Sequence, residues 1–116
     1  MFNFHHVSLS VRNLENSIEF YGLFGFKPAF RWQADDKTLS IVHLKQGQML
    51  LELFCFENAV TAPVSSQQLA TDLPRIGIKH FGIKVADIHE AREALQALGL
   101  ADGVEVVQGK TGIEYF

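Results

Sequence analysis

The 116-residue sequence has a single cysteine, three prolines and no cluster of positive charge. Cys55 cannot form a disulfide within the chain, and its apolar neighbours favour a buried thiol. Nucleic-acid binding requires a basic face, and a net charge of −3 with scattered Lys and Arg offers none. No apolar run approaches the ~20 residues of a membrane span. We therefore expect neither a nucleic-acid-binding nor a membrane protein.

The composition that remains is that of an ordinary globular domain. Hydrophobic residues make up 47% and charged residues 20%, enough apolar material for one core. The first residues, 1–11, lack the basic start and apolar stretch of a signal peptide. We therefore expect one soluble domain, 1–116, in the cytoplasm.

The first half of the sequence predicts one helix among four strands. Residues 2–11 alternate as in a half-buried strand, with Val7, Leu9 and Val11 on one face and His6, Ser8 and Ser10 on the other. A helix is expected to begin after Asn13 as its N-cap and to stop by Gly25. Further strands are expected at Phe26–Trp32, Leu39–Leu44 and Met49–Phe56, with a turn at Gly47.

The second half begins with a different composition. Residues 58–77 contain Pro and a Ser-Ser-Gln-Gln stretch, typical of a linker or lid. Beyond it, a strand at 78–85 and a helix capped by Asp87 and ended by Gly99 are expected. Strands at 104–107 and 112–116 complete the pattern. The expected organisation is a first module at 1–57, this linker, and a second module at 78–116.

A duplication relates the two modules. His6 to Leu14 matches His80 to Ile88 at a constant offset of 74 residues, and Gly25 matches Gly99 at the same offset. The matched features are a histidine, alternating apolar residues, a helix cap and a helix stop, which predicts a repeated strand–helix unit. The offset carries Glu52 to position 126. We therefore expect the natural chain to continue for about 10–20 residues, one hairpin with a further carboxylate.

Three residues of this repeat predict a metal site. His6 and His80 occupy equivalent strand positions, on the face opposite the helices. Glu52 lies in the middle of an apolar strand, where a carboxylate is costly to bury unless it is paired or metal-bound. Two imidazoles and a carboxylate suit a divalent ion such as Zn, Ni, Fe or Mn. Alternation puts His5 on the helix side of its strand, and a surface or core position is favoured for His43 and His89, which have no partner in the repeat. Glu114 would be a ligand only in an unusual sheet register.

With these motifs in view, the sequence resembles the vicinal-oxygen-chelate superfamily of glyoxalases, bleomycin-resistance proteins and extradiol dioxygenases. The resemblance covers nearly the whole chain and is carried by residues 6–21, 25–26, 51–53 and 77–81. It implies an α+β fold of two βαβββ modules, paired into a curved mixed-sheet cup, with the second module lacking its last strand. It also implies His6, Glu52 and His80 as metal ligands, contributed by the first and fourth strands of the modules.

A Glu as second ligand resembles the glyoxalase I branch. That branch implies a lyase or isomerase that binds a small substrate through two vicinal oxygens and forms an enediolate, with Glu52 as the catalytic base. Lactoylglutathione lyases of this kind carry an Arg and an Asn where this chain has Ser10 and Phe56, so the glutathione site is in doubt. Expected substrate contacts are Ser8, Ser10, Phe54 and Lys84; Lys84 is either an anion anchor or a solvated lysine.

Two other functions remain open at this point. An extradiol-type dioxygenase with ferrous iron needs the same two His and one carboxylate. A non-catalytic small-molecule binding or resistance protein would retain its ligand without His6. In each case the partner is a small molecule, and open sheet edges favour a homodimer.

Overall fold

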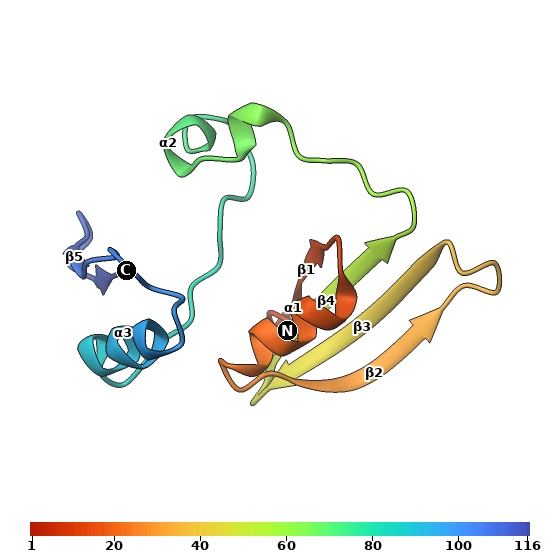
Figure 1. Ribbon diagram of the computed structural model, residues 1–116, viewed down its shortest axis with the longest axis horizontal. Coiled ribbons are helices and arrows are strands. Elements are labelled where there is room, and N and C mark those ends of the chain that lie inside the picture. The colour runs from red at the N-terminus through yellow and green to blue at the C-terminus, as the bar shows by residue number, and fades with distance from the viewer. The chain divides into compact units, whose positions relative to one another are not determined.

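A computed structural model describes residues 1–116, which divide into two compact units, 1–79 and 80–116 (Figure 1). The first unit opens with a βαβββ module. Its elements are β1 (His6–Ser10), α1 (Leu14–Gly22), β2 (Lys27–Gln33), β3 (Leu39–Gln46) and β4 (Met49–Phe56). This order confirms the expected α+β class and the first βαβββ module.

The four strands form one mixed sheet in the order β1-β4-β3-β2. β1 runs parallel to β4, whereas β4, β3 and β2 are antiparallel to their neighbours. β3 and β4 are joined by a tight turn in which Gly47 has a φ of +56°, a backbone conformation that favours glycine. This register places Ser8, Glu52 and His43 side by side on three neighbouring strands.

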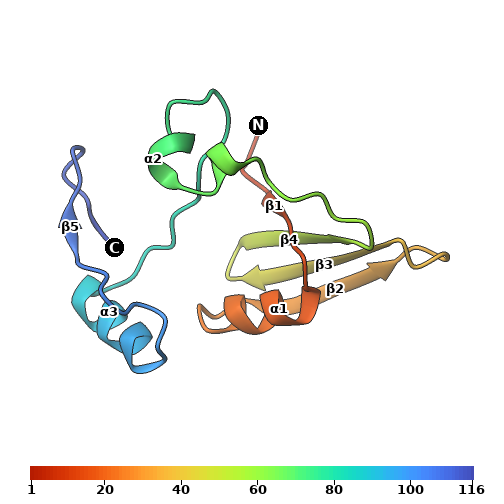
Figure 2. The same cartoon turned by 45° about the horizontal axis from the view of Figure 1, so that its top comes forward.

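The apolar core of this unit lies between the sheet and α1. Figures 1 and 2 show α1 lying along one face of the sheet. The fully buried side chains come from the two central strands and are Val42, Leu44, Leu51 and Leu53. Val7 and Leu9 of β1 pair with Leu51 and Leu53, so they share this face, as the sequence predicts. The alternate residues of the strands therefore lie on the opposite, open face.

Local contacts fix the helix at both ends. Asn13 caps α1 as predicted, its Oδ1 accepting from the backbone N–H of Asn16 at 3.0 Å. The helix ends at Gly22, earlier than expected, and Gly25 (φ +86°) opens the turn into β2. Glu15 on α1 accepts from Arg31 on β2 at 2.8 Å, which ties the helix to the edge strand.

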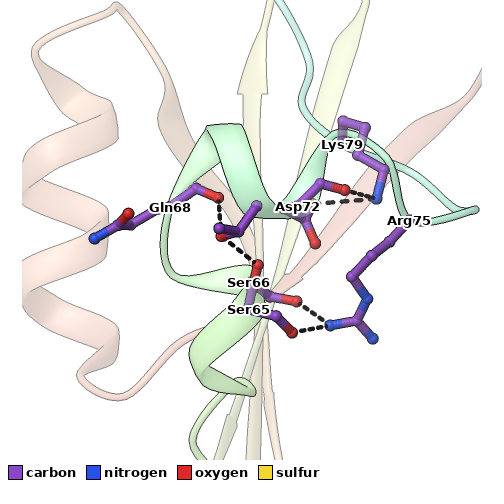
Figure 3. A network of polar contacts seen from close by, with 7 residues as sticks. Ser65, Ser66, Gln68, Asp72, Arg75 and Lys79 are labelled. Carbon is purple, nitrogen blue, oxygen red and sulfur yellow. Dashed lines mark hydrogen bonds and ion pairs between the residues drawn. The ribbon is translucent and has the colours of Figure 1, made fainter.

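The segment after β4 holds two short helical turns, η1 (Val64–Ser66) and α2 (Leu69–Asp72). They are joined by their own polar contacts (Figure 3). Arg75 Nη1 donates to the hydroxyls of Ser65 and Ser66 at 2.7 and 2.8 Å. Lys79 Nζ lies 2.9 Å from the carbonyl of Asp72 and 3.2 Å from its carboxylate. These bonds give the predicted linker a local structure of its own.

The second unit contains α3 (Ile88–Ala97) and a short hairpin of β5 (Val107–Gln108) and β6 (Glu114–Tyr115). Asp87 caps α3 as predicted, accepting from the N–H groups of His89 and Glu90 at 2.8 and 3.0 Å. Gly99 has a φ of +71° just beyond the helix. None of the helices in the chain is long and apolar enough to cross a membrane.

The predicted strand at 78–85 was wrong, because this stretch has no regular secondary structure. Strands persist when a neighbour satisfies their backbone N–H and C=O groups. In the first unit, β1 is held in the sheet by β4. The second unit has one strand pair, β5 with β6, and the alternation of residues 80–85 meets no equivalent of β4 there. The alternation of apolar residues does not show whether a neighbouring strand is present to pair with this stretch.

Candidate functional site

The candidate site is built around Glu52, in the middle of β4 on the open face of the sheet. Its side chain is only 19% exposed, and both carboxylate oxygens have partners. Ser8 Oγ donates to Oε2 at 2.6 Å, and His43 Nε2 lies 2.8 Å from Oε1. The buried face of β4 explains the position: Leu51 and Leu53 point to the core, so Glu52 points away from it.

His6 lies at the edge of this cluster. Its Nε2 is 3.6 Å from Glu52 Oε2. Its other ring nitrogen, Nδ1, is 2.9 Å from Nδ1 of His5, and the two rings meet edge to face. One of these two nitrogens must donate, and if His6 is the donor, its Nε2 is left as a free acceptor. His5, which alternation predicts on the helix side of the strand, instead contacts the ring of His6.

The hydrogen bonds around Glu52 also control its charge. The Ser8 hydroxyl is the main cause that lowers the pKa of Glu52 below its ordinary value, and the His43 hydrogen bond is the second. Partial burial raises the pKa of Glu52, but the hydrogen bonds lower it by more. Glu52 is therefore an ionised carboxylate at neutral pH.

His43 belongs to this candidate site, although the sequence favours a surface or core position for it because the repeat offers it no partner. The signal was present in the hairpin: a two-residue turn at Gly47 and Gln48 pairs Gln46 with Met49 and so sets His43 opposite Glu52. Counting outward from the turn would have found the pair.

The donors at this site fit a divalent cation in part. Two ligand atoms bound to one ion at about 2.0–2.2 Å lie roughly 3.0–3.5 Å from each other. The separation of 3.6 Å between His6 Nε2 and Glu52 Oε2 is close to that range. No group of three or more His, Cys, Asp and Glu side chains gathers closely enough to hold a metal ion. His80, the third predicted ligand, is an exposed residue of the second unit.

The predicted substrate contacts occupy different places. Ser8 is bonded to Glu52, and Phe54, the next residue along β4 on the same face, stacks on Phe56 with ring centres 6.4 Å apart. Ser10 lines a cavity of about 630 Å³ at the end of β1. Lys84 is exposed in the second unit. Within the first unit, therefore, the structure brings together His6, Ser8 and Glu52.

Aromatic side chains border the polar cluster on the open face. The Phe30 ring lies 5.5 Å from the ring of His43. Phe30 is 54% exposed and Phe56 46% exposed, which is high for large apolar side chains. A polar centre with aromatic walls suits a small organic ligand better than a structural ion pair.

Comparison with known families identifies the family to which this chain belongs. The sequence profile of the Glyoxalase/Bleomycin resistance protein/Dioxygenase superfamily matches residues 3–115, almost the entire chain. The chain belongs to this superfamily. The vicinal-oxygen-chelate resemblance expected from the sequence is thereby confirmed, and so is its α+β fold. No curated protein matches the chain.

Two solved structures are similar to this glyoxalase-superfamily chain along nearly its whole length. The crystal structure of SMU.1112c is 27% identical, with a TM-score of 0.72, and the match covers 98% of this chain and 87% of that one. The glyoxalase family protein from Enterococcus faecalis is 23% identical, also with a TM-score of 0.72, over 97% of this chain and 84% of its own. The second likeness bears on the fold alone.

Proposed function

We propose that this glyoxalase-superfamily protein is a metal-dependent lyase or isomerase that acts on a small substrate with two vicinal oxygens. One observation carries the proposal. Glu52, an ionised and partly buried carboxylate on an apolar strand, has the Nε2 of His6 3.6 Å from its Oε2. An anion and an imidazole held together in a partly buried place favour a bound cation.

In this proposal His6, Glu52 and His80 hold the ion, and Zn, Ni, Fe or Mn suits the donor set. When bound there, such an ion would supply Lewis-acid chemistry to two adjacent oxygens of the substrate. Glu52 and the two imidazoles leave coordination positions for substrate. His80 is included in this set as the repeat partner of His6.

Glu52 has a second role in the proposal, the transfer of a proton between adjacent carbons. Ser8 and His43 fix both of its oxygens, so the carboxylate keeps one orientation relative to the substrate. The same bonds lower its pKa, which makes it a weak base. Proton transfer to Glu52 therefore requires an acidic C–H beside a carbonyl group. Ser8, Ser10, Phe54 and Lys84 are proposed as substrate contacts.

Metal analysis of the purified protein tests the first half of the proposal. We expect close to one divalent ion per chain, and we expect loss of that ion in His6→Ala, Glu52→Gln and His80→Ala. His89→Ala, an exposed histidine on α3, is the matched control and should retain the metal. Equal metal content in His80→Ala and the wild type would remove His80 from the ligand set.

The reaction is tested with a panel of small 2-hydroxycarbonyl compounds and 2-oxoaldehyde–thiol adducts in D₂O. Exchange of the proton on the carbon next to the carbonyl, followed by NMR, should depend on both the metal and Glu52. Oxygen consumption with catechols and ferrous iron, without such exchange, would identify a dioxygenase. Binding without turnover that survives His6→Ala would identify a sequestering protein.

The proposed assembly is a homodimer in the cytoplasm. Phe30, Trp32 and Phe56 are 54%, 47% and 46% exposed, and large apolar side chains of this kind commonly lie in subunit contacts. The single thiol of Cys55 suits a reducing compartment. Light scattering coupled to size-exclusion chromatography should give twice the 13.0 kDa chain mass, and monomer at high concentration would contradict the dimer.

A further inference from the structure

A second candidate site lies in the first unit, where the parallel strands β1 and β4 end. A cavity of about 630 Å³ is lined there by residues 10–12, Phe56 and residues 58–62. The strand side of the cavity is held by backbone hydrogen bonds. Val11 N–H donates to the Phe54 carbonyl at 2.8 Å, and Glu57 N–H donates to the Thr38 carbonyl at 3.0 Å. Residues 59–62, on the other side, have no regular secondary structure.

Arg12 is the charged group of this cavity, and it has no acidic partner. Its Nη2 donates to the hydroxyl of Thr61 at 3.3 Å, a long and neutral contact. Arg31 and Arg92, in contrast, each pair with a glutamate at 2.8 Å. No Asp or Glu lines the cavity, although the chain carries a net charge of −3. An arginine left without an anion in an acidic protein favours an anionic ligand.

The remaining lining narrows the class of anion. Ser10, Asn58 and Thr61 supply hydroxyl and amide groups that can donate hydrogen bonds to oxygen. Val11, Phe56 and Val60 supply apolar surface beside them. The planar guanidinium fork matches the two oxygens of a carboxylate. A carboxylate attached to a short apolar chain fits this mixture better than a bare inorganic anion.

We infer that the Arg12 cavity binds a carboxylate of the substrate, so that the substrate is an acid whose vicinal oxygens lie at the far end of the molecule. This inference rests on the proposed function, which puts the vicinal oxygens at His6 and Glu52. Ser8, the strand neighbour of Glu52, lies two residues before the end of β1, and Arg12 follows that end by two residues. At about 3.3 Å per strand residue, the four residues between Ser8 and Arg12 span at most roughly 13 Å, which limits the distance between the reacting oxygens and the carboxylate.

The binding step is tested without turnover, on the metal-free full chain. Butyrate, butyramide and inorganic phosphate are titrated into ¹⁵N-labelled protein, and the backbone amides of Val11 and Thr61 are followed by NMR. Butyrate should shift these signals in a saturable way, more tightly than phosphate, and butyramide should not. Arg12→Gln should weaken butyrate binding about tenfold or more, and Arg12→Lys by less, because lysine keeps the charge but loses the fork. Arg92→Gln, an arginine of the second unit, is the matched control.

The outcomes separate this inference from the proposed function. Butyrate binding should persist in His6→Ala and Glu52→Gln, because the cavity does not include those side chains. Equal shifts with butyramide, or unchanged butyrate affinity in a folded Arg12→Gln protein, would overturn the carboxylate site. Thr61→Val provides a second variant should Arg12→Gln not fold, and it should weaken binding less. For acids found as substrates in the exchange assay, Arg12→Gln should raise KM about tenfold or more.

Discussion

His43 on β3 lies directly opposite Glu52 on β4, with its Nε2 2.8 Å from the Oε1 of the carboxylate. The other carboxylate oxygen faces His6 and Ser8. His43 thus holds Glu52 from the side away from His6, and leaves Oε2 turned toward the proposed ion. A ligating carboxylate is commonly fixed in this way by a neighbour that does not itself touch the metal.

The first prediction follows from that arrangement. His43→Ala should lower the affinity for a divalent ion about 10–100-fold, because Glu52 loses its orienting partner. His43→Gln retains an N–H donor and should recover part of the loss. Isothermal titration with Zn²⁺ measures both, and His89→Ala serves as control. Full affinity in His43→Ala would mean that His43 contributes structure only.

The residues around Glu52 show how far the sequence alone can predict this site. Alternation along β1 predicts His6 on the open face, and the cost of burying a carboxylate in an apolar strand singles out Glu52; the structure brings the two within 3.6 Å. The first prediction depends only on the two-residue period of a strand, and the second only on the type of residue and its apolar neighbours. His43 was not predicted as a neighbour of Glu52, because cross-strand neighbours depend on the pairing register. The alternation of residues along one strand does not determine that register.

The second unit shows that local features can be predicted from the sequence but long-range strand pairing cannot. The Asp87 cap and the helix behind it are local features, set by a side chain and the amides two and three residues away, and they were predicted correctly. A strand at 80–85 depends on a remote partner, and its apolar alternation could not disclose whether one is present. The place of His80 relative to Glu52 depends on the same long-range pairing and stays a prediction.

The second prediction concerns the cap of α1. Asn13→Ala removes the acceptor of the Asn16 amide and should lower the free energy of unfolding by about 0.5–2 kcal/mol. Asn16→Ala is the matched control, because that residue contributes its backbone amide and keeps it. Urea denaturation followed by circular dichroism compares the two variants. A larger loss in Asn16→Ala would contradict the capping role.

The third prediction compares two neighbouring leucines of β4. Leu51 is fully buried against the helix, and Leu50 is half-buried on the open face. Leu51→Ala should cost about 2–5 kcal/mol of unfolding free energy, because it leaves a cavity in the core. Leu50→Ala should cost clearly less. Denaturant titrations at one pH give both values, and equal losses would mean that the open face is covered as fully as the core.

The fourth prediction concerns the polar cluster of the 64–79 segment. Lys79→Met keeps the length of the side chain but removes its bonds to the carbonyl and carboxylate of Asp72. Hydrogen exchange at the amides of Asp72 and Leu73, which close the α2 turn, should become faster. Lys110→Met in the second unit is the control. Unchanged exchange would show that Lys79 does not stabilise the turn.

The last prediction uses the charge of Glu52. Since the Ser8 hydroxyl is the main cause of its lowered pKa, Ser8→Ala should raise that pKa toward the ordinary value of 4.5. A carboxylate with a lowered pKa stabilises the fold above its unfolded-state pKa, and this contribution is lost as the pH falls through the folded-state pKa. Ser8→Ala should therefore be less stable than the wild type at pH 7, and the difference should shrink as both proteins are acidified below about pH 4.

A ¹³C NMR titration of the Glu52 carboxyl, with chelator present, measures the pKa directly in the wild type and in Ser8→Ala. Urea denaturation at pH 7 and pH 3 measures the stability difference. Ser10→Ala is the matched control, because Ser10 lies two residues further along the same face and does not touch Glu52. A pKa that stays low in Ser8→Ala would assign the shift to His43. A stability difference that persists at pH 3 would mean that Ser8 acts through packing rather than through the charge of Glu52.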